Sequence, residues 1–94
     1  MKVVIIIPAR YQSSRLPGKP LIGICGQSMI KRTYDRCCLA LEGKYVFVAT
    51  DDNRIFSHCQ KNGMNVIMTS ELCKTGTDRV YEASKQIDAD IYIN

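Results

Sequence analysis

The stretch Val3-Val-Ile-Ile-Ile-Pro-Ala-Arg-Tyr-Gln-Ser-Ser-Arg-Leu-Pro-Gly-Lys-Pro-Leu21 joins an apolar run to a basic loop. The run, Val3–Ile7, has the length and the β-branched side chains of a buried strand. A loop that leaves the carboxyl end of the first strand is where an open α/β sheet usually binds its ligand. This stretch therefore predicts both the centre of the fold and the place of a binding site.

The loop after the run carries the groups that a polyanion needs. Three cations, two hydroxyls and no acid lie between residues 8 and 21: Arg10, Arg15, Lys19, Ser13 and Ser14. Gly18 lets the backbone approach a phosphate closely, and the neighbouring prolines reduce the entropy lost when the loop becomes ordered. The order is not that of a Walker A loop, because Pro20 stands where serine or threonine is required. Composition alone leaves two interpretations open, a triphosphate site and a solvated basic loop.

Helical and strand patterns alternate along the rest of the chain. Three helices are expected: one capped by Gln27-Ser28 and ending at Gly43, one capped by Asp51 or Asp52, and one beginning at Thr77. Further strands are expected at residues 45–49, 66–68 and 90–93. This alternation predicts an α/β fold with a mainly parallel sheet and right-handed crossovers, in one small domain over residues 1–94.

The charge distribution favours a small anionic ligand. Of the net charge of +4, the excess lies in the first third of the chain, where six cations precede the first acid, Asp35. So local a cluster suits a phosphate-bearing small molecule better than nucleic acid, which needs a longer basic stripe. The apolar run before Pro8 is too short for a membrane span or a signal-peptide core. We therefore expect neither a nucleic-acid nor a membrane partner.

The cysteines indicate a reducing compartment. The five of them contain no Cys-x-x-Cys pair, and His58 is the only histidine in the chain. Small buried thiols explain this pattern better than metal ligands or disulfides do. The expected location is the cytoplasm.

Two later segments place polar residues at the start of a helix. In Ala49-Thr50-Asp51-Asp52 the carboxylates are expected to cap the helix that follows, because they can accept from its free amide groups. In Thr75-Gly76-Thr77-Asp78-Arg79, Thr75 and Asp78 have the spacing of a capping box. A helix start with a glycine and two hydroxyls also suits contacts to a polar ligand.

These three segments together resemble the 3-deoxy-manno-octulosonate (Kdo) cytidylyltransferases, also called CMP-Kdo synthetases. The resemblance covers Lys2 to Asn94. The sialic-acid cytidylyltransferases share the Pro-Ala-Arg opening but lack a sequence like Arg15–Leu21. Members of the Kdo family are considerably longer, and this chain stops just before their Gln-Gly-Asp-Glu-Pro stretch, whose aspartate holds magnesium. The resemblance therefore implies an N-terminal, shortened version of a Rossmann-like nucleotidyltransferase fold.

The resemblance also implies a reaction, in which CMP passes from CTP to Kdo to give CMP-Kdo and pyrophosphate for lipopolysaccharide biosynthesis. The implied cofactor is Mg²⁺, with no metal ligand in this chain, and the complete enzyme is expected to be a homodimer. The implied catalytic residues, which hold the phosphates, are Arg10, Arg15 and Lys19. The implied nucleotide-binding residues are Ala9, Arg10, Ser13, Ser14, Arg15, Lys19, Thr75, Gly76, Thr77 and Arg79. Arg79 is expected to read the cytosine edge, with Asp78 capping the helix or orienting Arg79.

Three hypotheses remain, of which this interpretation is the leading one. The chain is either part of an enzyme, a module that only binds nucleotide, or a shortened copy that pairs with a complete subunit. Among enzymes, the rival is a cytidylyltransferase for another sugar acid. On the leading interpretation the chain by itself is expected to be inactive.

Overall fold

The apolar run found in the sequence forms one of the two inner strands of the sheet. The computed structural model describes residues 2–11, 19–21, 23–24, 27–41, 45–73 and 75–93, with only the backbone described at Lys19, Ile24 and Gln27. Four parallel strands form the main sheet in the order β5-β4-β1-β6. They are β1 (Val3–Pro8), β4 (Val46–Thr50), β5 (Val66–Met68) and β6 (Ile91–Ile93). The α/β architecture and the parallel sheet are therefore confirmed.

Alternating side chains of the central strands enter two separate cores. Ile5 and Val46 are register partners whose side chains belong to the core that also includes the two helices following β1 and β4. Ile6 and Ala49 belong to the core on the opposite face. Because successive side chains of a strand point to opposite faces, an apolar run such as β1 requires cover on both faces.

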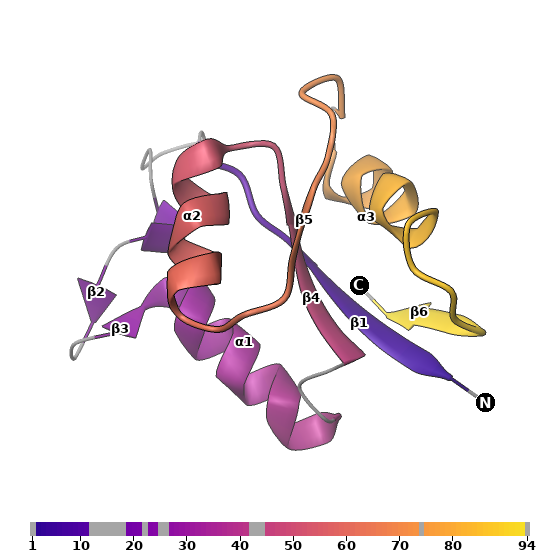
Figure 1. Ribbon diagram of the computed structural model, residues 1–94, viewed down its shortest axis with the longest axis horizontal. Coiled ribbons are helices and arrows are strands. Elements are labelled where there is room, and N and C mark those ends of the chain that lie inside the picture. Colours follow the sequence, from indigo (N-terminus) through magenta and orange to yellow (C-terminus); the bar gives the residue numbers. More distant parts are fainter. Residues whose placement is uncertain are drawn as a thin grey trace.

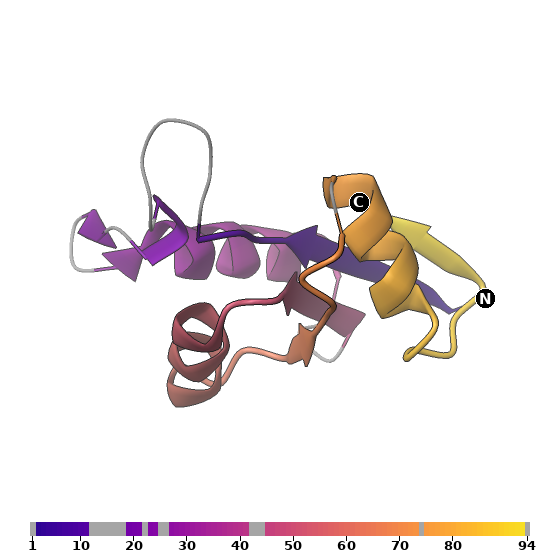
Figure 2. The same cartoon turned by 90° about the horizontal axis from the view of Figure 1, so that it is seen from above.

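Helices supply that cover. α1 (Met29–Ala40) and α2 (Asn53–Lys61) pack on one face, and α3 (Gly76–Ser84) packs on the other. Figures 1 and 2 both place α1 and α2 on one side of the strands and α3 on the other. Each helix crosses from the end of one parallel strand toward the start of the next, as expected for a doubly wound sheet.

The helix starts follow the capping residues. Ser28 caps α1 by accepting from Lys31 N, Asp52 caps α2, and Thr75 caps α3 by accepting from Asp78 N at 3.0 Å. The third helix thus starts at Gly76, one residue before the predicted start, because the hydroxyl of Thr75 is the N-cap acceptor. Gly63 follows the C-cap of α2 with φ +71°, a conformation that favours glycine. Gly43, the predicted stop of α1, lies outside the described residues.

Two small elements were not predicted. A short 3-10 helix, η1 (Lys19–Leu21), is followed by an antiparallel hairpin of β2 (Gly23–Ile24) and β3 (Gln27–Ser28). Two-residue strands are too short to show the period-2 pattern that reveals a strand in a sequence. The hairpin ends at the N-cap of α1 and so leads the chain from the basic loop into that helix.

The sequence predicted that the cysteines are buried as small apolar side chains, and Cys59 fits this prediction fully. Cys59 is fully buried between α2 and the sheet, and burial raises the pKa of its thiol to about 11. The protonated thiol therefore packs as a small apolar side chain. Cys37, Cys38 and Cys73 are half-buried, and all four of these cysteines are free thiols.

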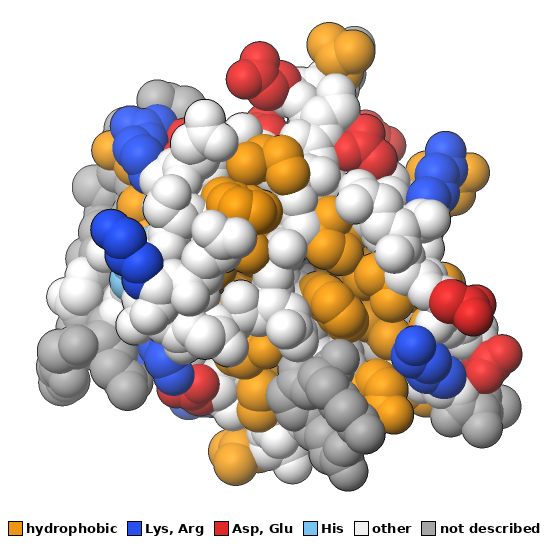
Figure 3. Space-filling model, viewed as in Figure 1, with side chains coloured by type: hydrophobic (Ala, Val, Ile, Leu, Met, Phe, Trp, Pro, Cys, Tyr) orange, Lys and Arg blue, Asp and Glu red, His pale blue; other side chains and the backbone are white. Residues whose placement is uncertain are grey.

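The edges of the sheet expose part of its apolar surface. At one edge Met68 of β5 is 38% exposed, and Figure 3 shows hydrophobic side chains gathered between α2 and α3 over this strand. At the other edge Ile91 and Ile93 of β6 are 43% and 46% exposed. In the described part of the chain, no helix is both long and apolar enough to cross a membrane.

Candidate functional site

The strand order creates a switch point beside β1. The chain winds from β1 to β4 and β5 on one side and then returns to place β6 on the other side of β1. Open α/β sheets bind ligands at such a point, outside the carboxyl ends of the strands. Ala9 and Arg10 leave β1 at this end, so the basic loop begins at the position that the fold favours for a ligand.

Backbone hydrogen bonds join the ends of β1, β4 and β5, where the first two sequence motifs lie. Ala9 N donates to Ala49 O at 2.9 Å, and Thr69 N donates to Thr50 O at 2.8 Å. At α3, a Cβ built on Gly76 would lie 3.5 Å from Pro8 Cγ, so the start of this helix contacts the end of β1. Segments more than sixty residues apart in the chain therefore meet at one edge of the sheet.

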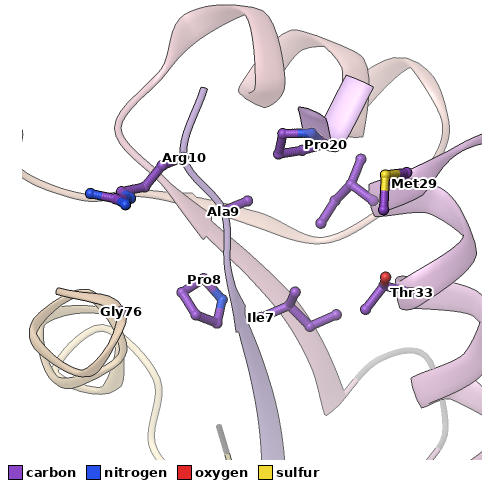
Figure 4. A pocket seen from close by; sticks show the side chains of 9 residues that line it. Ile7, Pro8, Ala9, Arg10, Pro20, Met29, Thr33 and Gly76 are labelled. Atoms are coloured by element: carbon purple, nitrogen blue, oxygen red, sulfur yellow. The ribbon is translucent and has the colours of Figure 1, made fainter. Parts of the chain in front are cut away.

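A cavity of about 360 Å³ lies across the end of β1. Its walls come from β1, α1 and α3, and include Pro8, Ala9, Met29, Thr33 and Gly76. Figure 4 shows Met29 and Thr33 on the α1 side of the strand and Gly76 on the opposite side, where the side chain of Arg10 also extends. The predicted residues Ala9, Arg10 and Gly76 therefore share one mostly apolar cavity.

A second cavity, of about 320 Å³, is lined mainly by charged and polar side chains and is called the polar cavity below. It is lined by residues that include Arg10, Tyr11, Asp51, Glu71 and Arg79. Arg10 lines both cavities, so it stands at their border. The second cavity offers guanidinium donors together with carboxylate acceptors, a combination that suits a ligand with mixed hydrogen-bonding groups.

Arg79 is the most deeply buried charge described in the chain. Its side chain is 1% exposed, NH1 donates to Thr69 Oγ1 at 2.7 Å, and NH2 lies 3.4 Å from Asp51 Oδ2. These contacts tie α3 to the ends of β4 and β5. The Nε atom of Arg79 is buried and has no hydrogen-bond partner among the described residues. An unsatisfied buried donor costs about 1–3 kcal/mol, so an acceptor that reached it would bind favourably.

The carboxylates of the Ala49–Asp52 segment have different roles. Asp52 is the N-cap of α2, as predicted for one of the two acids. Asp51 instead pairs with Arg79. Asp78 was expected to cap α3 or to orient Arg79. Its backbone amide donates a hydrogen bond to Oγ1 of Thr75, the N-cap residue. The carboxylate that the structure pairs with Arg79 is that of Asp51.

Asp52 also holds Arg54. Its carboxylate accepts from Arg54 Nε at 3.1 Å and from Arg54 NH2 at 2.7 Å, in addition to the backbone amides of Arg54 and Ile55. The hydrogen bonds from the Arg54 side chain are the largest cause that lowers the pKa of Asp52 below its usual value, and those from the backbone amides add to this effect.

This lowered pKa predicts how stability depends on pH. Between the folded and the unfolded pKa of Asp52, the unfolded chain binds more protons than the folded chain does. The contribution of Asp52 is therefore complete above the unfolded pKa, about 3.9, and is lost as pH falls through the lower folded pKa. Urea unfolding from pH 7 to pH 2 should show the wild type converging on Asp52→Asn at acid pH. A constant difference between the two chains across this range would contradict the assignment.

The remaining predicted site residues are placed as follows. Ser13, Ser14 and Arg15 lie outside the described residues, and Lys19 is described only as the first residue of η1. Thr75 and Thr77 are exposed at the start of α3 and line neither cavity. Their roles, and those of the residues that do line the cavities, stay predictions.

Some residues of the site were not found from the sequence. Thr69 follows β5 directly, and a polar residue at the carboxyl end of a parallel strand is a signal that could have indicated it. Tyr11, Met29 and Thr33 carry no such signal, because their places in the cavity walls depend on how α1 and the loop pack.

The described residues do not fit a metal centre by themselves. No three His, Cys, Asp or Glu side chains among residues 2–11, 19–21, 23–24, 27–41, 45–73 and 75–93 come together as possible ligands. Both carboxylates at the start of α2 are also engaged by arginines, Asp51 by Arg79 and Asp52 by Arg54.

Comparison with known proteins connects this geometry to one group of enzymes. A family model described as "Cytidylyltransferase" matches residues 4–94. The 3-deoxy-manno-octulosonate cytidylyltransferase of Desulfatibacillum aliphaticivorans is 50% identical over 97 residues, which cover 100% of this chain and 40% of that protein. The 8-amino-3,8-dideoxy-manno-octulosonate cytidylyltransferase of Shewanella sp. (strain W3-18-1) is 47% identical with the same coverage of both chains.

A solved structure shows the same fold. The structure of CMP:2-keto-3-deoxy-manno-octonic acid synthetase complexed with CTP matches with a TM-score of 0.87 and 48% identity. The match covers 98% of this chain and 38% of that one. The chain therefore spans about 40% of the length of the curated relatives it matches.

Proposed function

This chain belongs to the cytidylyltransferase family, and on that premise we propose that it forms the CTP-binding part of an enzyme that makes CMP-Kdo. The resemblance inferred from the three sequence motifs and the nucleotidyltransferase type of fold are both confirmed by the relatives and by the structural match. Since the chain spans about 40% of those relatives, the activity proposed is that of the longer protein.

The observation that carries the proposal is the meeting of the three motifs around Arg10 and Arg79. Arg10 borders the apolar and the polar cavity, and Arg79 is held in the polar one by Asp51 and Thr69. Cytosine presents an amino donor beside acceptor atoms. The guanidinium of Arg79 and the carboxylate of Glu71 supply the opposite groups in one cavity, which supports a cytosine rather than a phosphate at this position.

The proposed reaction needs positioning and charge neutralisation. The anomeric hydroxyl of the sugar acid attacks the α-phosphate of CTP, and pyrophosphate leaves. Arg10, Arg15 and Lys19 hold the β- and γ-phosphates and stabilise the charge on the leaving group. Ser13 and Ser14 donate hydrogen bonds to the same oxygens. All five residues lie in the loop segment from Arg10 to Lys19, so a single segment would bind the triphosphate.

Magnesium enters the proposal with the nucleotide. The described residues do not provide a set of ligands for it, so we propose that CTP binds as its Mg²⁺ complex. The protein ligands of that ion are then expected outside the described residues, and none of the roles given to Arg10, Arg79 or Asp51 depends on it.

The acceptor defines a second candidate function. A relative named for an 8-amino-3,8-dideoxy sugar acid is 47% identical to this chain, close to the 50% of the relative named for Kdo. The two acceptors differ at one carbon and share the 3-deoxy-octulosonate frame, so the N-terminal CTP site would serve either. We favour Kdo because the relative with the greater identity carries that name.

The cellular setting follows from the proposed reaction. CTP and the free thiols of Cys37, Cys38, Cys59 and Cys73 are both compatible with the cytoplasm, where we place the enzyme. CMP-Kdo would supply a sugar for lipopolysaccharide biosynthesis. We propose that the complete enzyme is a homodimer.

Pyrophosphate release tests the function in any protein of the relatives' full length that includes this sequence. With CTP and Mg²⁺ present, we expect release with Kdo to exceed release with the 8-amino sugar acid and with a sialic acid. The 94-residue chain assayed under the same conditions should release none. Preference for the 8-amino acceptor would establish the second candidate, and release with neither octulosonate would refute both.

A further inference from the structure

Tyr11, at the start of the basic loop, packs against the core formed by α1, α2 and β4. On the ring lies the guanidinium of Arg54, whose Cζ is 3.2 Å from the ring centroid. A guanidinium over an aromatic face is attracted by the ring electrons, and the contact has a defined geometry.

Asp52 holds Arg54 in that geometry. The side chain of Arg54 is 58% exposed, so an unrestrained guanidinium would sample many rotamers. The two hydrogen bonds from its Nε and NH2 to the carboxylate restrict it, and Asp52 is 16% exposed and itself fixed as the N-cap of α2. Bidentate pairing of this kind sets the orientation of the guanidinium plane as well as its position.

The contact joins α2 to the nucleotide site. Tyr11 follows Arg10 directly in the chain, and both side chains line the polar cavity that also contains Arg79. Asp51, the residue before Asp52, is the partner of Arg79. The turn between β4 and α2 therefore carries two neighbouring acids that each pair with an arginine, Asp51 with Arg79 and Asp52 with Arg54.

We propose that Arg54 is a positioning residue for nucleotide binding. Its stack on Tyr11 fixes the backbone that carries Arg10 and so sets where the Arg10 guanidinium meets the nucleotide, while Arg54 itself does not touch CTP. This inference rests on the proposed function, since CTP is the ligand whose binding it would affect. The sequence alone indicates only that Arg54 is an exposed residue near the start of a helix, and the inference gives this residue a role.

Calorimetric titration of the chain with CTP tests the role. Arg54→Ala should weaken CTP binding about fivefold, and Tyr11→Leu should weaken it at least as much, because it removes the same stack and Tyr11 also lines the cavity. The double variant should bind no more weakly than Tyr11→Leu alone, since Arg54 acts only through the stack. Tyr11→Phe keeps the ring and should bind as the wild type does.

Two controls show whether Arg54→Ala weakens CTP binding through lost positioning, through lost charge or through lost stability. Lys61→Ala removes one positive charge from the same helix and should leave CTP binding unchanged. Urea unfolding of each variant shows whether weaker binding follows a loss of folded chain. The proposal is overturned if Arg54→Ala binds CTP like the wild type, if Lys61→Ala weakens binding equally, or if the effects of Arg54→Ala and Tyr11→Leu add. A wild-type chain that binds no CTP would instead refute the proposed function and this inference with it.

Discussion

Substituting Arg79 with methionine should abolish measurable CTP binding by the chain and lower its free energy of unfolding by about 2–4 kcal/mol. Arg79 is almost completely buried, and methionine would keep much of its length while removing every donor. Thr69 Oγ1 and Asp51 Oδ2 would then lose the groups that donate to them. Asp51 is 22% exposed, so water would reach it and the loss should stay below that of a fully buried pair.

Two further variants separate the structural part of this effect from the ligand part. Thr69→Val removes one hydrogen bond to Arg79 but keeps the guanidinium, so stability should fall by about 1–3 kcal/mol, because NH1 loses its buried partner, while CTP still binds. Arg79→Lys keeps a charge near Asp51 but loses the planar fork, so it should bind CTP poorly despite partly recovered stability. Urea unfolding and calorimetric titration measure the two quantities. Normal CTP affinity in Arg79→Lys would show that Arg79 serves only the fold.

The second large effect is expected on turnover, when a cation proposed to bind the phosphates of CTP is removed. In the longer protein, Arg15→Ala or Lys19→Ala should raise the barrier to CMP transfer by several kcal/mol, roughly 3 kcal/mol or a hundredfold in turnover. In the proposed reaction each change would remove a charge-assisted contact to the β- and γ-phosphates, whose charge increases as pyrophosphate leaves. Initial rates of pyrophosphate release at saturating CTP and Kdo measure the effect.

A matched control exists for these two cations as well. Lys61→Ala removes a positive charge on α2, outside both cavities at the end of β1, and should leave turnover unchanged. If the Arg15→Ala and Lys19→Ala variants also keep near-normal turnover, the basic loop does not bind the triphosphate in the reaction.

Local signals in the sequence predicted the framework of the fold. The β-branched run Val3–Ile7 forms one of the two inner strands, and the cap residues Ser28 and Asp52 mark where helices begin. These features depend on neighbouring residues only, on side-chain period and on free backbone amides, so they can be inferred from the chain itself. The resemblance to a family then supplied the order of the motifs and the expected ligand.

Contacts between distant segments could not be inferred in the same way. The pairing of Asp51 with Arg79 joins residues 28 positions apart, and it depends on which strand ends lie side by side. The stack of Arg54 on Tyr11 likewise requires that α2 pack over the start of the loop. Sequence patterns indicated that both acids at the start of α2 were capping candidates, but only the packed structure separates the cap, Asp52, from the arginine partner, Asp51.

Calorimetric titration of the 94-residue chain with CTP and with ATP, both in the presence of Mg²⁺, tests the central claim most directly. The polar cavity beside Arg79 and the cationic loop beside Arg10 predict binding of CTP in preference to ATP, with no pyrophosphate released when Kdo is added. Equal affinity for the two nucleotides, or no binding of CTP, would contradict the claim that this chain carries the CTP site.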